Sequence, residues 1–568
     1  RIVLSNRPDL CEYQCNGAMA AAKAYKKKPI DIATAVVENL TGDEMFSEIT
    51  AVMPGFINIR LNPQYLADYL GGMQKEEKLG LEETGHGETI IVDYGGANVA
   101  KPLHVGHLRS AVIGEAVKRM GKFLGYNMIG DVHLGDWGLQ MGLIIEELRD
   151  RKPDLVYFDE SYTGEYPAEA PFTISELEDI YPTASGKAKE DPAFKERAQT
   201  ATFKLQNGYA PFTAIWKHIM SVSLADLKKN YGNLDVHFEL WKGESDAQKY
   251  IPWLIQDLQD KGLAHESDGA LVVDIAEPTD SKELPPCIVR KSDGAALYAT
   301  SDLGTIIERE KDFQPVKYIY ITDKRQELHF VQVFRVARKA GYVKPETEMI
   351  HIGFGTMNGK DGKPFKTREG GVMRLQYLLE SVNEEMLKKI TENQKAKENL
   401  EISEEEAKET AKMIALAAIK YGDLSNQASK DYIFDIDRFT SFEGNTGPYI
   451  LYTIVRIKSI LNKYHSMGKD ESGAVIEAAH SASEKNLMLA LSGFGAMMEN
   501  AYEETAPHKI CSYIYELANA FNSFYHETKI MSEENEQIQK SYIRLLELTK
   551  SVLEICIDLL GFKAPERM

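Results

Sequence analysis

Two neighbouring stretches, VDYGGANVAKPLHVGHLRSAVIGEAVKR (residues 92–119) and VHLGDWGLQ (residues 132–140), decide the fold of this 568-residue chain. Residues 90–94 form an apolar run followed by glycines, which predicts a buried strand. From the second histidine of HVGH (residues 104–107) onward, apolar residues recur every three or four positions, which predicts a helix. HVGH therefore lies where a strand ends and a helix begins.

A helix start of this kind is a candidate phosphate site. Its backbone N–H groups are unpaired and carry partial positive charge, and both properties attract phosphate. His104 and His107 project from one face of the first turn, and Gly106 leaves room for a flat ligand such as adenine. The alternative is a chance pattern, but 13 histidines and 42 glycines in 568 residues would produce only about 0.02 HxGH matches.

These motifs resemble a known family. HVGH is similar to the HIGH signature of class I aminoacyl-tRNA synthetases. NVAKPLHVGHLRS together with HLGDWGLQ resembles the arginyl-tRNA synthetases in particular, and the resemblance extends over nearly the whole chain. It implies an arginine–tRNA ligase whose partners are ATP, L-arginine and tRNA(Arg). Such an enzyme forms arginyl-adenylate and pyrophosphate, then transfers arginine to the 3′ end of the tRNA.

Length, net charge and cysteine content limit the classes of protein to which the chain can belong. The length predicts two to four domains, and no apolar run reaches the ~18 residues of a membrane span. The net charge of −20 argues against a nonspecific nucleic-acid binder, although a local basic surface could still hold one specific tRNA. Five scattered cysteines show no zinc pattern and fit a reducing compartment. We expect a cytoplasmic monomer without protein metal ligands, with residues preceding Arg1.

The expected architecture is multidomain. Residues 1–83 predict a small α+β domain, which the resemblance places on tRNA. Residues 84–375 predict a Rossmann-like, doubly wound α/β catalytic domain with a helical insertion at about 151–245. Residues 376–440 predict a helical connector, and residues 441–568 an all-α bundle that by resemblance binds the anticodon.

An arginine pocket can be argued from carboxylates, because a planar guanidinium group binds best to a carboxylate fork. Asp93 precedes HVGH, and Tyr298 and Asp302 lie four apart on one face of a predicted helix start. A capping or surface role is the alternative for Asp302. By resemblance, these three residues hold the guanidinium group. Asn98 and Gln326 resemble the residues that hold the α-amino and carboxylate groups.

A second nucleotide motif follows in FGTMNGKDGKPFKTR (residues 354–368), which resembles the mobile KMSKS loop of class I enzymes. Thr367 stands where the general motif has its second lysine, and by resemblance Lys101 compensates. An ordinary basic turn is the alternative. The predicted catalytic residues are His104, His107, Lys101, Lys366 and Arg368; the predicted ATP contacts are His104, Gly106, His107, Gly355 and Lys366.

The expected mechanism needs no activating base, because the arginine carboxylate is already a nucleophile. It attacks the α-phosphate of ATP in line, and catalysis consists of positioning and electrostatic stabilisation by the positive field of the predicted catalytic residues. Mg²⁺ would bridge the phosphates without a dedicated protein cage.

The C-terminal region contains a candidate RNA surface. Tyr449, Tyr452 and Arg456 fall on one helical stripe, where they could stack on and neutralise an unpaired RNA loop. A stripe packed into the core explains the same spacing equally well. The stripe resembles the anticodon-binding helix of the arginyl family, and Tyr513 and Met568 match positions that touch the anticodon in relatives.

Two other classes of function remain as alternatives. A nucleotidyltransferase that acts without tRNA could share the HxGH chemistry, but it would need neither the helical bundle nor a guanidinium pocket. A non-catalytic RNA-binding protein built on a synthetase fold would be expected to have lost the two histidines, which this chain keeps.

Overall fold

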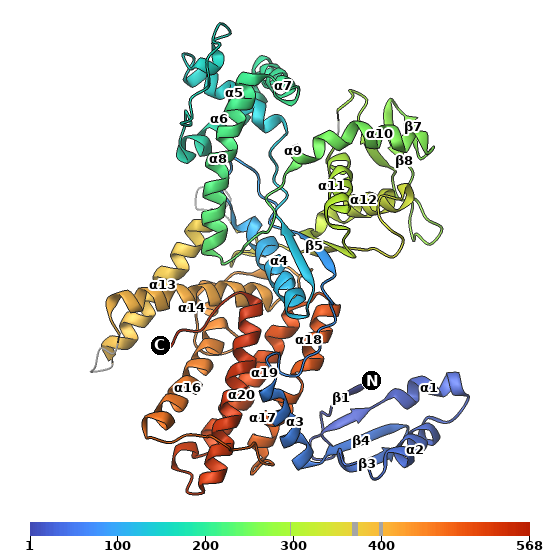
Figure 1. The fold of residues 1–568 in the computed structure, drawn as a ribbon, viewed down its shortest axis with the longest axis vertical. Helices are drawn as coiled ribbons and strands as arrows, with labels where there is room; N and C mark the ends of the chain where they lie inside the picture. The colour runs from blue at the N-terminus through green and yellow to red at the C-terminus, as the bar shows by residue number, and fades with distance from the viewer. Residues whose placement is uncertain (296, 366–372, 397–401) are drawn as a thin grey trace.

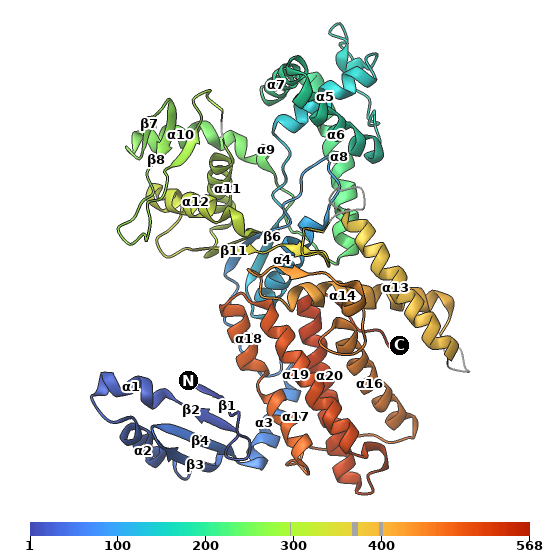
Figure 2. The same cartoon turned by 180° about the vertical axis from the view of Figure 1, so that it is seen from behind.

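The computed structural model describes residues 1–295, 297–365, 373–396 and 402–568 (Figure 1). The predicted catalytic residues Lys366 and Arg368 lie outside these ranges. An N-terminal domain, a central parallel sheet with two projecting lobes and a C-terminal helical bundle follow one another along the chain (Figures 1 and 2).

The N-terminal domain is an antiparallel sheet, in the order β1-β2-β4-β3, with two helices against it. Its elements are β1 (Ile2–Leu4), β2 (Tyr13–Cys15), α1 (Gly17–Tyr25), α2 (Pro29–Leu40), β3 (Phe46–Val52) and β4 (Phe56–Leu61). Alternate residues of β4 face the small core, as expected for a sheet with one covered face. Helix α3 (Pro63–Lys75), capped by the Asn62 side chain, leads away from the domain and packs on the C-terminal bundle.

The central sheet is parallel, in the order β11-β10-β5-β6. Its strands are β5 (Thr89–Asp93), β6 (Asn127–Asp131), β10 (Lys317–Asp323) and β11 (Glu348–Phe354), joined by α4 (Val105–Phe123), α11 (Tyr298–Phe313) and α12 (Glu327–Ala340). Strand β5 lies between β6 and β10, so the chain order reverses at its carboxyl end. Ligands bind at this point in open α/β sheets.

Two lobes extend from the sheet (Figures 1 and 2). The helical lobe contains α5 (Leu139–Arg151), α6 (Ile174–Glu190), α7 (Pro192–Gln206) and α8 (Ala210–Asn233). The second lobe contains α9 (Glu244–Ala247), α10 (Ile251–Asp260), β7 (Ala264–Ser267), β8 (Ala270–Val273) and β9 (Cys287–Arg290), which pack with α11 and α12.

The C-terminal third of the chain is mainly helical. It comprises α13 (Leu375–Ala396), α14 (Glu404–Leu424), α15 (Ile436–Phe439), α16 (Gly447–Ser466), α17 (Ala482–Ser492), α18 (Phe494–Glu503), α19 (Pro507–Glu527) and α20 (Glu536–Leu560). A short parallel pair, β12 (Met357–Asn358) with β13 (Tyr432–Ile433), ties the segment after β11 to this region. Of the helices in the described ranges, none is long and apolar enough to cross a membrane.

Helix α4 is the element that the sheet, the connector and the bundle share. Near its start, the buried Arg109 side chain forms an ion pair with Asp423 of α14, with 3.1 Å between Nε and Oδ2. Arg109 Nη1 also donates to the carbonyls of Gly355 and Lys430, at 3.0 and 2.8 Å. One guanidinium group therefore joins α4 to the end of β11 and to the connector.

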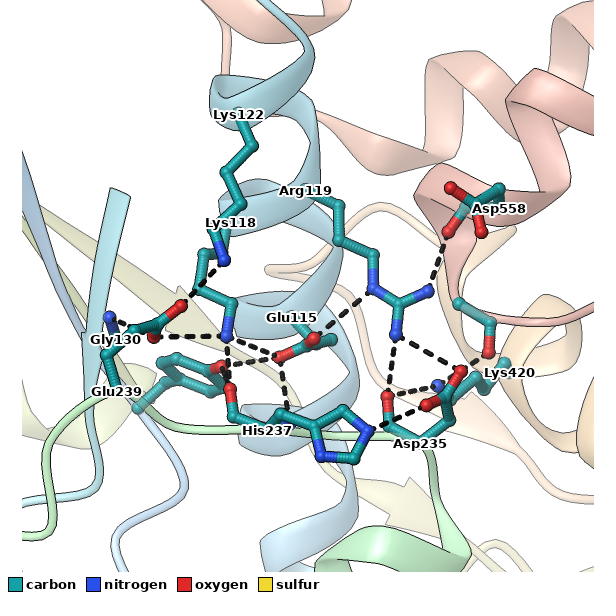
Figure 3. Close-up of polar contacts among 12 residues, drawn as sticks. Glu115, Lys118, Arg119, Lys122, Gly130, Asp235, His237, Glu239, Lys420 and Asp558 are labelled. Atoms are coloured by element: carbon teal, nitrogen blue, oxygen red, sulfur yellow. Dashed lines mark hydrogen bonds and ion pairs between the residues drawn. The ribbon is translucent and has the colours of Figure 1, made fainter. Parts of the chain in front are cut away.

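The second half of α4 carries a network of charged groups (Figure 3). Glu115 accepts hydrogen bonds from the Tyr94 hydroxyl at 2.5 Å and from Arg119 at 3.2 Å. Arg119 also donates to the carbonyl of Asp558 at the end of α20, at 2.8 Å, and to that of Asp235, at 2.9 Å. The helix that begins at HVGH is thus bonded at its far end to the C-terminal bundle.

Arg109→Ala is expected to destabilise the folded protein by about 3–5 kcal/mol, the typical cost of leaving a buried charge without its partner. The unpaired group would be Asp423, which has no exposed side-chain surface. Calorimetry should show a lower unfolding temperature, and Asp423→Asn in the same background should recover part of the loss. Arg7→Ala is the control, since its ion pair with Asp9 is exposed on both sides; equal unfolding temperatures for the two single variants would contradict the prediction.

Candidate active site

The two histidines of HVGH are locked to the backbone of the helix that they begin. His104 is the N-cap of α4, and its Nδ1 accepts a hydrogen bond from the Gly106 N–H at 3.0 Å. His107 Nδ1 accepts from the His104 N–H at 3.1 Å. Because both Nδ1 atoms are acceptors, the proton of each neutral ring lies on Nε2.

Both imidazoles are neutral at physiological pH. Burial lowers the pKa of His107 to about 3, with a further contribution from His104. Burial and the nearby Lys101 lower the pKa of His104. The histidines can therefore donate Nε2–H bonds to a phosphate, but they add no net charge. This corrects the expectation that they contribute to a positive field.

Gly106 is required by its own motif. A Cβ atom at this position would lie 2.6 Å from the His104 ring, too close for any side chain. The space beside Gly106 that the sequence suggested for adenine is thus occupied by the His104 imidazole where the Cβ atom would lie.

Of the other predicted catalytic and ATP-binding residues, the structure describes Lys101 and Gly355. Lys101 places its Nζ 4.5 Å from the centre of the Tyr181 ring, in the helical lobe. The chain after the KMSKS-like loop returns to HVGH, because Val105 N–H donates to the carbonyl of Met373 at 2.9 Å. Gly355 lies at the end of β11, with its carbonyl held by Arg109.

A buried carboxylate pair occupies the carboxyl ends of β5 and β6. Asp93 and Asp131 both bind Arg309 Nη2, at 2.7 and 3.0 Å. Burial raises the pKa of Asp93, and the attraction of Arg309 opposes that shift. One carboxylate oxygen of Asp93 is therefore already bound to Arg309. That Asp93 also binds the guanidinium group of a substrate stays a prediction.

Asp302 lies one turn into α11, between two histidines. His329 Nε2 is 2.5 Å from Asp302 Oδ2, and His133 Nε2 is 3.6 Å from Oδ1. The side chain is 15% exposed, so it is neither an exposed surface acid nor a helix cap. The carboxylate is instead held in place at the predicted arginine pocket.

Asn98 and Tyr298 line one cavity of about 480 Å³, together with Glu244 and Gln140. Asn98 approaches the chain at Gly135, where a Cβ atom would lie 2.0 Å from Asn98 Oδ1. Burial raises the pKa of Glu244 to about 7. Gln326, in the short 3-10 helix Lys324–Gln326 that follows β10, is exposed and does not line this cavity.

A larger cavity of about 760 Å³ lies in the C-terminal bundle. Tyr449, Tyr452, Arg456 and Met568 line it, while the opposite face of α16 is packed in the core. The Arg456 guanidinium group lies between two aromatic rings, 4.9 Å from Tyr452 and 4.8 Å from Tyr525. The stripe is thus a cavity wall and not part of the core.

Tyr513 does not belong to this cavity. Its hydroxyl donates to the carbonyl of Ala490 at 2.8 Å, which directs the ring toward α17. Tyr515, two residues further along α19, lines the cavity instead. Residues two apart on a helix face different directions, and this corrects the grouping of Tyr513 with the other aromatic residues.

Sequence reasoning missed His133, Arg309 and Glu244, although all three lie among the predicted pocket residues. His133 belongs to the HLGDWGLQ segment, whose resemblance to the family identifies the segment but gives this histidine no role. Nothing in the spacing of Arg309 or Glu244 indicated a position beside Asp93 or Asn98.

Three family models match the chain. They are described as the arginyl tRNA synthetase N terminal domain, over residues 1–61; the class I (R) tRNA synthetase catalytic domain, over residues 72–436; and the DALR anticodon binding domain, over residues 450–568. Together they confirm the predicted fold class, with a small N-terminal domain, an α/β catalytic domain and a helical C-terminal domain.

Similar proteins agree with these matches. An arginine–tRNA ligase of Agathobacter rectalis is 67% identical, with 100% of this chain and 96% of that protein covered. The corresponding ligase of Alkaliphilus oremlandii is 57% identical, with 100% and 95% covered.

Solved structures lead to the same result. The arginyl-tRNA synthetase of Plasmodium falciparum matches with a TM-score of 0.80 at 26% identity, covering 100% of this chain and 94% of that one. The Thermus thermophilus enzyme shares the fold, with a TM-score of 0.81 at 21% identity, covering 100% and 96%. From the catalytic match over residues 72–436 and the full-length relatives, this chain belongs to the arginyl-tRNA synthetases of class I.

Proposed function

We propose that this chain is an arginine–tRNA ligase that joins L-arginine to ATP as arginyl-adenylate and then transfers arginine to the 3′ end of tRNA(Arg). The observation that carries the proposal is the position of the two backbone-locked histidines: they begin α4, the helix that follows β5 and its buried carboxylate Asp93. A phosphate site next to carboxylates suits a reaction between ATP and a cationic amino acid.

In the activation step, the carboxylate of arginine attacks the α-phosphate and pyrophosphate leaves. His104 and His107 would donate Nε2–H bonds to phosphate oxygens, and the amino end of α4 would add its dipole. These groups are fixed before the reaction, so they stabilise developing charge without reorganising. Lys101, Lys366 and Arg368 are proposed to supply the positive charge that the neutral imidazoles lack.

Substrate recognition is proposed to rest on the acidic pocket. Asp302, held by His329, and Asp93 would bind the guanidinium group, with Tyr298 at the pocket mouth. Asn98 and Gln326 are proposed to bind the α-amino and carboxylate groups.

Mg²⁺ is proposed as the companion of ATP. Among the described residues, the cluster with metal-ligand geometry is His465, Glu471 and Glu547, and it lies in the C-terminal bundle. At HVGH the rings offer N–H groups, which cannot be ligands. The ion would therefore be held mainly by phosphate oxygens, where it neutralises charge.

The C-terminal cavity is proposed to hold the tRNA anticodon, because the tyrosine rings and the half-buried arginine that line it suit unpaired bases. We further propose a cytoplasmic monomer. Its proposed domains are residues 1–83, 84–375 with the insertion at about 151–245, 376–440 and 441–568.

His104→Ala is expected to slow adenylate formation by about 10²-fold or more, the effect of losing one preorganised donor in the transition state. Single-turnover formation of arginyl-adenylate in the presence of tRNA measures it. His265→Ala, which removes an exposed histidine of β7, should leave the rate unchanged. A His104→Ala rate within a few-fold of wild type, with the fold intact, would refute the assignment of HVGH.

Asp302→Asn is expected to raise the KM for arginine by roughly 10- to 100-fold, because it removes the charge of a charge-assisted pair but keeps the shape. The KM for ATP should change little. Asp260→Asn, at an exposed carboxylate, is the matched control. If steady-state kinetics give unchanged arginine KM and kcat for Asp302→Asn, the pocket is wrongly placed.

Exchange between ATP and pyrophosphate with arginine is expected to be nearly silent until tRNA is added. The physical reason would be a population shift, in which tRNA binds the active arrangement of the catalytic site better than the inactive one. Robust exchange in the absence of tRNA would contradict this coupling.

Tyr452→Ala should weaken tRNA binding by ~1–3 kcal/mol, a stacking-sized loss, and should raise the tRNA concentration that switches exchange on. Maximal exchange at saturating tRNA should persist. Tyr452→Phe is the control, because it keeps the stacking ring and loses only the hydroxyl near Arg456. Normal tRNA affinity in Tyr452→Ala would show that the ring does not contact the anticodon.

A further inference from the structure

His133 has an unusual environment for a histidine that no proposed step uses. It follows β6 with a left-handed backbone, at φ +46°, a conformation that residues other than glycine adopt at a cost. Its side chain is only 14% exposed. Within the described part of the chain, its Nδ1 is buried and has no hydrogen-bond partner, which is expensive unless a ligand satisfies it.

The ring is surrounded by acids from four elements. Its Nε2 lies 3.6 Å from Asp302 Oδ1 of α11. The other charged groups that act on it are Asp93 of β5, Asp131 of β6, Glu244 of α9, Asp136 of its own loop and Arg309 of α11. Arg309 is the one cation in this set, and its Nη2 already binds Asp93 and Asp131. The pocket therefore holds more negative than positive charge when His133 is neutral.

The titration of His133 follows from these neighbours. Burial alone would lower its pKa, but the attraction of Asp93 and Asp302 exceeds that effect and the pKa is raised above its usual value. The ring therefore binds its proton more tightly than an exposed histidine does.

We propose that His133 is a specificity-determining residue of the arginine site: its imidazolium occupies, in the free enzyme, the charge position that the substrate guanidinium group takes over. The protonated ring balances Asp93 and Asp302 until arginine arrives. Binding then brings one positive charge into the pocket and releases one proton from His133 to solvent, so that charge is conserved. This inference rests on the proposed arginine site.

The exchange of one cation for another has consequences for selectivity and for pH. A competing amino acid whose side chain has a similar shape but no charge does not displace the proton from His133. Its side chain therefore lies against an imidazolium, whereas the guanidinium group of arginine lies against a neutral imidazole. Below the pKa of His133, arginine competes with a proton, and its apparent Kd rises up to about tenfold per pH unit as pH falls. Above that pKa no proton remains to be released, and the affinity is constant.

Glu244 is the competing source of a proton. Its pKa of about 7 means that a nearby cation would also favour its ionised form. Arginine binding would then release a proton from Glu244, as it would from His133. The experiment must therefore separate the two residues, and substitution of each one alone does so.

The test is calorimetric titration of the full chain with L-arginine, in buffers of different ionisation enthalpy, between about pH 6 and pH 8.5. Wild type should release about one proton per arginine near pH 6, and this release should fall as pH rises through the pKa of His133. His133→Asn, which suits a left-handed backbone, should release none and bind with a Kd that no longer depends on pH. His133→Gln provides a second neutral side chain, and Glu244→Gln should still release the proton.

The possible results are distinct. Binding without proton release by wild type overturns the inference but leaves the arginine site standing. Release that persists in both His133 variants also overturns it, because another group of the pocket, Glu244 or the His329 that contacts Asp302, would then be the source. Release that disappears in Glu244→Gln overturns it as well, because Glu244 would then be that source. Failure of wild type to bind arginine at any pH overturns the arginine site and this inference with it.

Discussion

Helix α4 is buried along nearly all of its length and yet carries charged side chains, so each of these charges must meet a partner. Arg109 finds it in α14, Lys118 in Glu239, and Arg119 in Glu115 and the end of α20. Removing one of these buried partners would lower the stability of the folded protein substantially, because the remaining charge would be left unpaired. The connector and the bundle are consequently fixed around the same helix whose first turn is the proposed nucleotide site.

The proposed phosphate half and the proposed amino-acid half of the active site differ in how they hold charge. The phosphate half relies on neutral N–H donors and a helix dipole, because its imidazoles are buried with their Nδ1 atoms already bonded to the backbone. The amino-acid half concentrates carboxylates and tolerates their mutual repulsion by enclosing Arg309 among them. A polyanionic substrate and a cationic one can therefore approach each other from environments suited to each.

Local patterns were sufficient to predict the framework. The apolar run before HVGH became β5, and α11 begins at Tyr298, where a helix start was predicted. These predictions succeeded because strand and helix periods are properties of neighbouring residues. The class of each domain followed from the same information.

Contacts between distant segments could not be predicted in this way. Arg309 and Asp93 are 216 residues apart, so no spacing rule brings them together, and the ionisation of the HVGH histidines depends on burial by several elements. The bundle cavity gives a second example: Tyr515 lines it, whereas Tyr513, which was grouped with the cavity residues, points toward α17. Family resemblance identified the helix, whereas the direction of each side chain depends on how that helix packs.

The far-end anchoring of α4 has a mechanical consequence. A helix of 19 residues is about 28 Å long, and close packing makes it move as a stiff rod. If a movement of the bundle tilted the helix by only about 2° about its end near Arg119, HVGH would be displaced by about 1 Å, and misplacement of that size can cost ~10²-fold in rate. The helix can thus act as a lever that converts a small movement of the C-terminal bundle into a large change in the rate of adenylate formation.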